Sequence, residues 1–539
     1  MFASPARRAS SSLVRAQYGP HVGGKFIDGA GAVIPILNPA TNQPLINVTS
    51  ASPTDVNNAI SAAQDAFKLG TWSRAPALHR ASVLTRLARL LEAKVPDLAQ
   101  VESLQTGRTI REMKVQLARL PEWIDYFAAL VRTQQGIVAP THGPLLNYVT
   151  RVPLGVVAQI TPFNHPLLIA IKKIAPALAA GNSVIVKPSE VNTLWPFSRV
   201  VLTKSQLAPI TVLEFAELAV EAGVPPSTLQ ILPGGPETGQ AIVSNPLIRK
   251  VDVTAGTAAG RAIGATVGKN LASYTAELGG KAPIVVFGDA DLQAAVNGVA
   301  FACFVASGQT CVSGTRLIVE DSIYDEFVDA FIKKVKSIGE RMGDPLNPKS
   351  TIGPLISKAS LDKTEQFLSR LPPHTKILTG GKRLTNPSPL DGFSRSSGNF
   401  FPPTVVADVK TSDELWQEEV FGPVVALTRF TGGEAEAVKL ANDCRYGLGA
   451  GIWTKDVGRA VRVSAGIEAG LVWVNAHHRN DPSSPWGGMK ESGIGRENGV
   501  EAFESYTQSK STIINTSSVE DMREKDDWFA DSGVEKRYG

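Results

Sequence analysis

Short apolar segments alternate with helical segments between residues 152 and 260, and this alternation limits the fold more than any other feature of the chain. Val152 to Ile160 and Ser183 to Lys187 are apolar runs of strand length, and Leu167 to Ala180 between them has helical spacing. Strands that alternate with helices predict a parallel sheet with crossover helices. Ligands of such sheets bind at the carboxyl ends of the strands, so the turns there are candidate binding positions.

Two glycine-rich turns follow later strands of the same pattern. Gly234 to Gly239 comes after the strand Leu229 to Leu232, and Ala255 to Gly260 comes after the strand Lys250 to Thr254. Glycines at a helix N-terminus can bring backbone N–H groups against a phosphate. Neither turn has the Gly-x-Gly-x-x-Gly pattern, so simple tight turns without a ligand remain the alternative.

Cys311 lies among small and polar residues in the segment Ser307 to Arg316, with a glycine on each side. A cysteine that only fills a core has bulky apolar neighbours, whereas these neighbours leave room for a molecule to reach the sulfur. This setting predicts an exposed thiolate nucleophile with a lowered pKa. The alternative is a buried, inert cysteine in a loop.

Two acidic segments lie near glycines or aromatics. Glu277 comes directly before Leu278-Gly279-Gly280, and Glu419 comes shortly before Phe421. A carboxylate beside a glycine pair can reach into a cleft, although a surface turn has the same composition. From the residues alone, both readings of Glu277 stay open.

Composition excludes several classes of protein. The 539 residues are too many for one core and predict two or three domains. The net charge of +4 is too small to indicate nucleic acid or a membrane surface, and no apolar run reaches the ~18 residues of a membrane span. Three cysteines without metal spacing indicate no metal site and a reducing compartment, with Cys303 and Cys444 as small core residues.

The two ends of the chain differ in composition. The first 27 residues contain no acid, and Arg7, Arg8 and Arg15 lie there among serines. This is the composition of a mitochondrial presequence, with a disordered arm as the alternative, so the expected compartment is the mitochondrial matrix or the cytoplasm. The tail from Ser518 is dense in charge and is expected to be a solvated extension.

Six motifs in chain order resemble those of the aldehyde dehydrogenase superfamily, over about Phe26 to Thr512. The resemblance implies an α/β fold with a Rossmann-like cofactor domain, an α/β catalytic domain and a small β oligomerisation arm. The motifs are Thr161-Pro162-Phe163-Asn164, Lys187-Pro188-Ser189-Glu190, Glu277-Leu278-Gly279-Gly280-Lys281, Gly308-Gln309-Thr310-Cys311, Glu419-Val420-Phe421-Gly422-Pro423, and Pro485-Trp486-Gly487-Gly488 with Ser492-Gly493-Ile494-Gly495-Arg496.

The same resemblance implies the domain limits and the assembly. Family members are usually dimers or tetramers, so a homodimer or homotetramer is expected. The implied limits are 1–17 for a disordered or targeting arm, 18–138 and 152–276 for the dinucleotide-binding domain, 277–505 for the catalytic domain, 139–151 and 506–516 for the oligomerisation arm, and 517–539 for a charged tail.

The resemblance also implies a mechanism. Cys311 attacks the aldehyde carbon, and the Asn164 amide with the Cys311 backbone N–H stabilises the oxyanion. Hydride then passes to NAD and leaves a thioester, which water hydrolyses with Glu277 as general base. The expected reaction converts a small-molecule aldehyde to its carboxylic acid. The alternatives are a coenzyme A-acylating relative and an inactive, binding member of the family.

Several residues are expected to contact the cofactor by the same resemblance. A carboxylate at Glu190 accepts hydrogen bonds from a free ribose 2′-hydroxyl and repels a 2′-phosphate, which favours NAD, while Lys187 nearby leaves NADP possible. Glu419 is expected to bind the nicotinamide-side ribose, with Phe421 packing nearby. The remaining expected contacts are Thr161, Gly235, Gly239, Thr254, Gly256, Gly260 and Leu278.

Two departures from the family pattern lie in the cofactor domain. The usual Thr-Gly-Ser-Thr turn reads Thr254-Ala255-Gly256-Thr257, which changes the expected pyrophosphate contacts. Val191 to Gln206 is an unusual insertion, because deleting it restores the family spacing. Valine codons begin with GT and glutamine can be encoded by CAG, so we hypothesise a retained in-frame intron, with a real insertion as the alternative. Sequencing the transcript decides between them.

A third departure is the polar character of the expected substrate funnel. His165 and Lys172 lie where many relatives carry aromatics, Arg479 precedes the Trp486 loop, and Val305 presents a small side chain near the cysteine. These residues predict a polar aldehyde, either anionic or a hydroxylated aromatic. The alternative is that Lys172 and Arg479 point to solvent.

Overall fold

The structure is a computed structural model that describes residues 15–188, 208–531 and 533–536. Residues 1–14, Glu190 and the insertion at 191–206 lie outside the described residues. Within the described residues, no helix combines the length and the apolar character that a membrane crossing requires.

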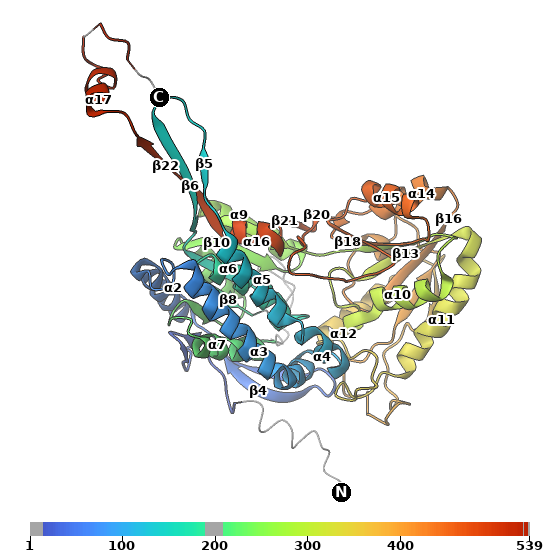
Figure 1. The fold of residues 1–539 in the computed structure, drawn as a ribbon. Coiled ribbons are helices and arrows are strands. Elements are labelled where there is room, and N and C mark those ends of the chain that lie inside the picture. The colour runs from blue at the N-terminus through green and yellow to red at the C-terminus, as the bar shows by residue number, and fades with distance from the viewer. Residues whose placement is uncertain (1–14, 189–207, 532, 537–539) are drawn as a thin grey trace.

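The chain builds an eight-stranded sheet whose middle strands are parallel (Figure 1). Chain order runs outward in one direction through β7, β8 and β9, and in the other direction through β10 and β11. The strand order is β2 (Lys25–Phe26), β1 (His21–Val22), β9 (Leu229–Ile231), β8 (Ser183–Lys187), β7 (Val156–Ile160), β10 (Ile248–Thr254), β11 (Ser273–Glu277) and β21 (Gly493–Ile494).

Helices cover both faces of this sheet, because alternate residues of its buried strands point to opposite sides. Val157 of β7 packs in one apolar cluster, whereas Val156 and Ala158 pack in another. The first face is covered by α3 (Ala77–Thr106), α5 (Leu120–Thr133), α6 (Pro166–Ala179) and α7 (Ile210–Ala222), and the second by α2 (Pro53–Leu69), α8 (Pro236–Ser244) and α9 (Thr257–Lys269).

A second sheet of seven strands forms the other large body of the molecule (Figure 1). Its order is β14 (Lys376–Thr379), β15 (Thr404–Ala407), β16 (Val424–Phe430), β13 (Gly314–Glu320), β12 (Ala282–Val286), β18 (Gly449–Trp453) and β19 (Leu471–Val474). The helices packed against it are α10 (Leu292–Phe304), α11 (Tyr324–Glu340), α12 (Lys358–Ser369), α14 (Gly433–Asn442) and α15 (Val457–Gly466).

A three-stranded antiparallel arm projects from the first body (Figure 1). It consists of β5 (Ile137–Ala139), β6 (Leu145–Pro153) and β22 (Thr507–Asn515), and the tail beyond it contains α17 (Val519–Lys525). The prediction of one strand over Val152 to Ile160 is wrong, because β6 ends in the arm and β7 begins in the sheet. Gly155 between them has φ +130°, a conformation that favours glycine.

The remaining described elements are short. They are β3 (Val33–Asn38), β4 (Gln43–Thr49), α4 (Ile110–Leu117), the 3-10 turns η1 (Val305–Gly308) and η2 (Asp321–Ile323), α13 (Glu414–Gln417), β17 (Tyr446–Gly447), β20 (Met489–Lys490) and α16 (Gly499–Ser505).

Candidate active site

The predicted turns meet at one edge of the first sheet. Lys187 ends β8, Thr161 follows the end of β7, Thr254 ends β10 and Glu277 ends β11. These four strands are neighbours and run parallel, so their carboxyl ends face the same side. The chain reverses its direction of winding between β7 and β10, which is where doubly wound sheets bind ligands.

The residues at this reversal point suit a polar ligand. The hydroxyls of Thr161 and Thr254 are buried and have no hydrogen-bond partner among the described residues. A side chain at Gly256 would meet no atom within 4 Å, so the backbone there is open to an approaching group. Gly235 and Gly256 precede the first turns of α8 and α9, where N–H groups favour phosphate. These features fit a dinucleotide.

Two more of the predicted cofactor residues serve packing in the structure. A Cβ at Gly260 would lie 2.3 Å from a methyl carbon of Leu278, so only glycine lets α9 approach that side chain. A Cβ at Gly239 would lie 3.3 Å from Cε of the buried Lys187, whose Nζ donates to the Pro188 carbonyl at 3.4 Å. Gly239 therefore borders the Lys187 side chain.

The segment before Cys311 has an unusual backbone. Ala306 and Ser307 have φ of 54° and 57°, a left-handed conformation that costs free energy for residues with a Cβ. Gly308 follows with φ 69°, and a Cβ on it would lie 2.3 Å from the Gly422 carbonyl oxygen. The turn is therefore held by close backbone packing.

Three predicted catalytic residues converge on this turn. The Asn164 side-chain amide donates to the carbonyl of Gln309 at 2.7 Å, two residues before Cys311. A Cβ on Gly280 would lie 2.0 Å from the Cys311 carbonyl oxygen, so the glycine pair after Glu277 packs directly on the cysteine backbone. Asn164, Glu277 and Cys311 therefore lie at one place, although they come from three separate parts of the chain.

An ion pair that the sequence did not reveal ties two of these segments together. The Glu112 carboxylate accepts from the Ala306 backbone N–H at 3.1 Å and from Arg108 Nε at 3.1 Å. Arg108 also donates to the Asn164 carbonyl at 3.4 Å and contacts His165 Nδ1 at 2.6 Å. Arg108 and Glu112 lie four residues apart at the start of a helix. This spacing did not predict the bridge, because the residues that the pair contacts are remote in the sequence.

Glu277 is a buried acid without a hydrogen-bond partner. Its side chain is 2% exposed, and neither carboxylate oxygen accepts a hydrogen bond from any described residue. Burial raises the pKa of Glu277 well above its ordinary value, and the charge of Glu497 raises it further, while Lys172 and Lys173 oppose the shift. A carboxylate in such a setting is a stronger base than an exposed one.

Cys311 departs from the prediction in its electrostatics. Its side chain is half-buried, and burial raises the pKa of the thiol to about 12, with further contributions from Glu277 and Glu419. The predicted low pKa is wrong for this structure, because the sulfur is buried and the charges of Glu277 and Glu419 add to the rise. The resting sulfur is a thiol, and a base has to take its proton before it can attack.

A buried network beside Glu277 was also missed. Lys173 contacts both Asp252 and Glu497, and the Tyr506 hydroxyl donates to Asp252 at 2.6 Å. Although burial opposes it, the charges of Lys172 and Lys173 lower the pKa of Glu497 to about 2. A sequence signal was present, because two adjacent lysines interrupt the otherwise apolar helix α6 and buried cations require partners.

The Glu419 motif lies against the Glu277 motif. The Glu419 carboxylate accepts from the Gly280 backbone N–H at 3.0 Å, and burial raises the pKa of Glu419. Phe421 has φ 58°, and its ring meets Phe163 edge-on at 5.6 Å between centroids. Both predicted residues therefore lie beside the cysteine turn.

The expected substrate-pocket residues separate into three groups. Lys172 is 1% exposed and Arg479 is exposed, so of the two only Arg479 points to solvent. His165 and Trp486 are buried near Cys311, and Trp486 packs with Val312 and Leu448 against the cysteine. The remaining residue, Val305, is half-buried and opens the strained turn.

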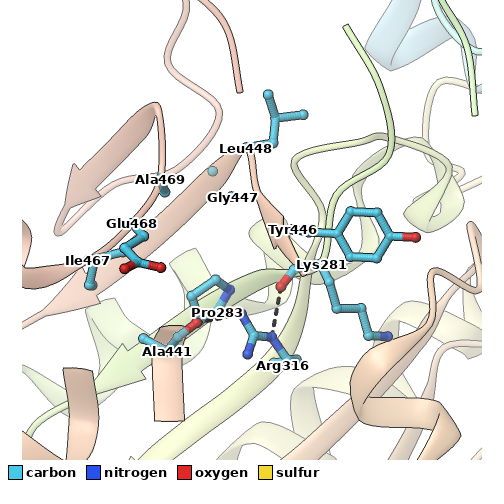
Figure 2. A pocket seen from close by; sticks show the side chains of 11 residues that line it. Lys281, Pro283, Arg316, Ala441, Tyr446, Gly447, Leu448, Ile467, Glu468 and Ala469 are labelled. Carbon is cyan, nitrogen blue, oxygen red and sulfur yellow. Dashed lines mark hydrogen bonds between the residues drawn. The ribbon is translucent and has the colours of Figure 1, made fainter. Parts of the chain in front are cut away.

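A small pocket borders Lys281, the last residue of the Glu277 motif, and contains none of the predicted catalytic residues (Figure 2). Lys281 and Arg316 line it, and Arg316 Nε donates to the Lys281 carbonyl at 2.8 Å. The Lys281 ammonium has no hydrogen-bond partner among the described residues, and burial lowers the pKa of Lys281 to about 7. Its charge acts on Glu419 rather than on the sulfur.

The other cysteines differ from each other. Cys303 is buried in α10, where its thiol donates to the Gly314 carbonyl at 2.9 Å, whereas Cys444 is half-buried and is not a core residue. The described part of the chain contains no cluster of His, Cys, Asp and Glu arranged to hold a metal ion.

Comparison with known proteins gives consistent matches. The model of the aldehyde dehydrogenase family matches residues 26–197 and 198–512, and the break between the two matches falls inside the 191–206 insertion. The chain is 36% identical to a betaine aldehyde dehydrogenase of Mesorhizobium japonicum, over 93% of this chain and 97% of that protein. It is 38% identical to a chloroplastic betaine aldehyde dehydrogenase of Amaranthus hypochondriacus, over 90% and 94%.

A solved structure gives a similar match. The crystal structure of betaine aldehyde dehydrogenase from Staphylococcus aureus in complex with NAD+ is 33% identical and has a TM-score of 0.88. The match covers 97% of this chain and 99% of that one. The expected architecture, two α/β bodies with a β arm, is confirmed.

Proposed function

The chain belongs to the aldehyde dehydrogenase family, and we propose that it oxidises an aldehyde to its carboxylic acid through Cys311 with NAD as the hydride acceptor. The enzyme class is that of NAD-dependent aldehyde dehydrogenases. The observation that carries the proposal is the convergence of Asn164 and the Glu277 motif on the Cys311 turn. Nucleophile, oxyanion donor and base are the three groups that this chemistry requires.

The first step forms a bond between sulfur and the aldehyde carbon. Because the Cys311 thiol has a raised pKa, Glu277 takes its proton as the sulfur attacks. The carbonyl oxygen becomes an oxyanion, which the Asn164 side-chain amide and the Cys311 backbone N–H stabilise. Donors of this kind typically contribute a factor of about 10²–10³ in rate.

The second step leaves a thioester on Cys311. Bound NAD supplies the acceptor for the hydride that leaves the former aldehyde carbon. Thr161, Thr254 and the N-termini of α8 and α9 are proposed to hold it, because their free hydroxyls and N–H groups face the strand-reversal point. Glu419, through its contact with Gly280, is proposed to position the ribose beside the sulfur.

The third step breaks the thioester with water. Once the proton taken from the thiol has passed from Glu277 to solvent, Glu277 takes a proton from the water and the water oxygen attacks the carbonyl carbon. The Cys311 thiolate then leaves and takes this proton back from Glu277. A base whose pKa is raised by burial is suited to this role near neutral pH. The Glu277 carboxylate accepts no hydrogen bond from a described residue and so is available to a water molecule, which favours water over coenzyme A as the acyl acceptor.

The test uses purified protein with a panel of aldehydes and either NAD or NADP. We expect absorbance of reduced NAD to grow with at least one aldehyde, a free acid as product without coenzyme A, and no activity in Cys311→Ala. Formation of an acyl-coenzyme A only when coenzyme A is added would establish the acylating alternative. No turnover with any aldehyde would support the alternative that the protein is an inactive, binding member of the family.

The arm is proposed to join subunits. Its exposed apolar residues include Ile137, Val138 and Ile513, which an isolated subunit would leave in water. We expect a homodimer or homotetramer by light scattering, and a monomer when Ile137 and Ile513 are both changed to Asp.

A further inference from the structure

Lys172 occupies an unusual position for a lysine. It lies on α6, two helical turns after Asn164, and its side chain is 1% exposed. Its Nζ is 2.7 Å from a Glu497 carboxylate oxygen and 4.5 Å from the centroid of the Trp486 ring. The ammonium is therefore held between a carboxylate and the face of an indole.

Trp486 connects this ammonium to the reaction site. Its side chain packs with Val312 and Leu448, and Cys311 packs against the same cluster. The His478 ring lies 6.3 Å from Trp486, and the His165 ring lies 5.9 Å from His478. Trp486 is thus part of the wall beside the sulfur, with imidazoles on one side and the ammonium on its face.

Lys172 shares its carboxylate partner with a second ammonium. Its partner Glu497 uses the other carboxylate oxygen for Lys173, which also contacts Asp252. Two carboxylates thus serve two ammonium groups, and Lys172 contacts the shared one. The two nearby imidazoles add no negative charge, and burial lowers the pKa of His478 to about 3, so this ring is neutral near pH 7. The wall beside Cys311 therefore presents the Lys172 ammonium on the Trp486 face.

A quaternary-ammonium aldehyde meets two obstacles at such a wall. Aromatic faces bind such cations through the ring quadrupole, and an indole is the strongest of these faces. The protein's own ammonium already occupies the Trp486 face. A second cation would lose this attraction and would also be repelled by Lys172 in a site of low dielectric.

We propose that Lys172 selects substrates by charge, so that the enzyme rejects cationic aldehydes and favours aldehydes that carry an anionic group. This inference rests on the proposed aldehyde oxidation. It separates this chain from relatives whose names state betaine aldehyde, a quaternary-ammonium aldehyde, as the substrate. It also chooses the anionic over the hydroxylated aromatic aldehyde among the polar substrates that the sequence predicted.

The experiment uses two pairs of aldehydes matched in size. Betaine aldehyde is paired with 3,3-dimethylbutanal, in which carbon replaces the charged nitrogen, and succinic semialdehyde is paired with pentanal. The measured quantity is kcat/KM, expressed per concentration of free, unhydrated aldehyde. For the wild type we expect the neutral member to exceed betaine aldehyde by about tenfold or more, and succinic semialdehyde to exceed pentanal.

Variants at Lys172 test whether this residue causes the selection. In Lys172→Met the ratio of betaine aldehyde to 3,3-dimethylbutanal should rise by about tenfold, and the preference for succinic semialdehyde should disappear. Lys172→Arg keeps the charge and should keep both ratios. Lys336→Met, at an exposed position on α11, is the matched control. Ratios between substrates on one protein cancel any general loss of activity.

Two outcomes would overturn the inference while leaving the proposed function intact. One is wild-type oxidation of betaine aldehyde as efficient as that of its neutral isostere, which needs no variant. The other is an unchanged charge preference in Lys172→Met. Failure of every aldehyde, neutral ones included, to reduce NAD would instead overturn the proposed function.

Discussion

Glu277 and Glu497 are both about 2% exposed and both lie within reach of Lys172 and Lys173, yet they are opposite in character. Glu497 pairs with both lysines, and their charges outweigh burial to lower the pKa of its carboxyl to about 2. Glu277 accepts no hydrogen bond from any described residue, and burial raises its pKa.

The difference shows that two acids in one buried site can have separate roles, one in stability and one in catalysis. A buried carboxylate that is paired with cations stays ionised and holds its neighbours in place, but it is a poor base. A buried carboxylate without partners costs folding free energy and is left basic enough to take a proton. Glu497 thus fixes the lysines, and Glu277 remains available to the substrate side.

The largest expected effect comes from removing the basicity of Glu277. In Glu277→Gln, steady-state turnover should fall by about 10²–10⁴-fold, because the amide cannot accept a proton from water. Rapid mixing should show no early burst of reduced NAD, because Glu277 is also the group that takes the Cys311 proton before the hydride leaves. Glu414→Gln, on the surface, is the control. Turnover near the wild-type rate in Glu277→Gln would show that another group is the base.

Removing the charge of Glu497 tests the other half of the comparison. Glu497→Gln leaves the buried Lys172 without an anion, so the free energy of unfolding should fall by about 3–5 kcal/mol at pH 7. Because the folded-state pKa of Glu497 is lowered, its contribution is present above the ordinary carboxyl pKa and is lost as pH falls towards 2. The deficit of the variant should therefore shrink in acid, as measured by urea denaturation.

The exposed pair Arg370 and Glu414 gives the matched control for this measurement. Its two hydrogen bonds are as short as 2.6 Å, yet both side chains are more than 40% exposed. Glu414→Gln should cost less than about 1 kcal/mol, because water screens a surface pair. Equal losses of unfolding free energy in Glu497→Gln and Glu414→Gln would show that burial does not strengthen the ion pair of Glu497.

The sequence allowed the fold to be predicted because strand and helix patterns are local, whereas the candidate catalytic groups were implied by the resemblance to the family. Strand β8 was predicted with the bounds that the structure shows, since Ser183 to Lys187 is a short apolar run between a glycine and a proline. The apolar run from Val152 to Ile160 was misread, because two strands in different sheets are separated only at Leu154 and Gly155. Composition does not distinguish an arm strand from a core strand when both are apolar.

The electrostatics of the site could not be predicted in the same way. The lowered pKa predicted for Cys311 assumed polar, open surroundings, but burial of the sulfur raises its pKa, and the charges of Glu277 and Glu419 from remote segments raise it further. The partners of Lys173, Asp252 and Glu497, lie far from it in the sequence. Only the two lysines inside the apolar helix α6 indicated a buried ion network.

The smallest expected effect is a gain in stability from the same substitution that stops catalysis. Because the folded-state pKa of Glu277 is raised above its ordinary value of 4.5, ionising it opposes folding as pH rises above that value. Glu277→Gln should therefore raise the free energy of unfolding by about 1–3 kcal/mol at pH 8, and by much less near pH 4, where Glu277 is protonated in both states. This is the reverse of the pH dependence expected for Glu497→Gln, so urea denaturation of both variants at two pH values separates the two acids directly. A Glu277→Gln protein that is less stable than the wild type at pH 8 would mean that the Glu277 carboxylate is stabilised in the folded state, and the contrast between the two acids would fail.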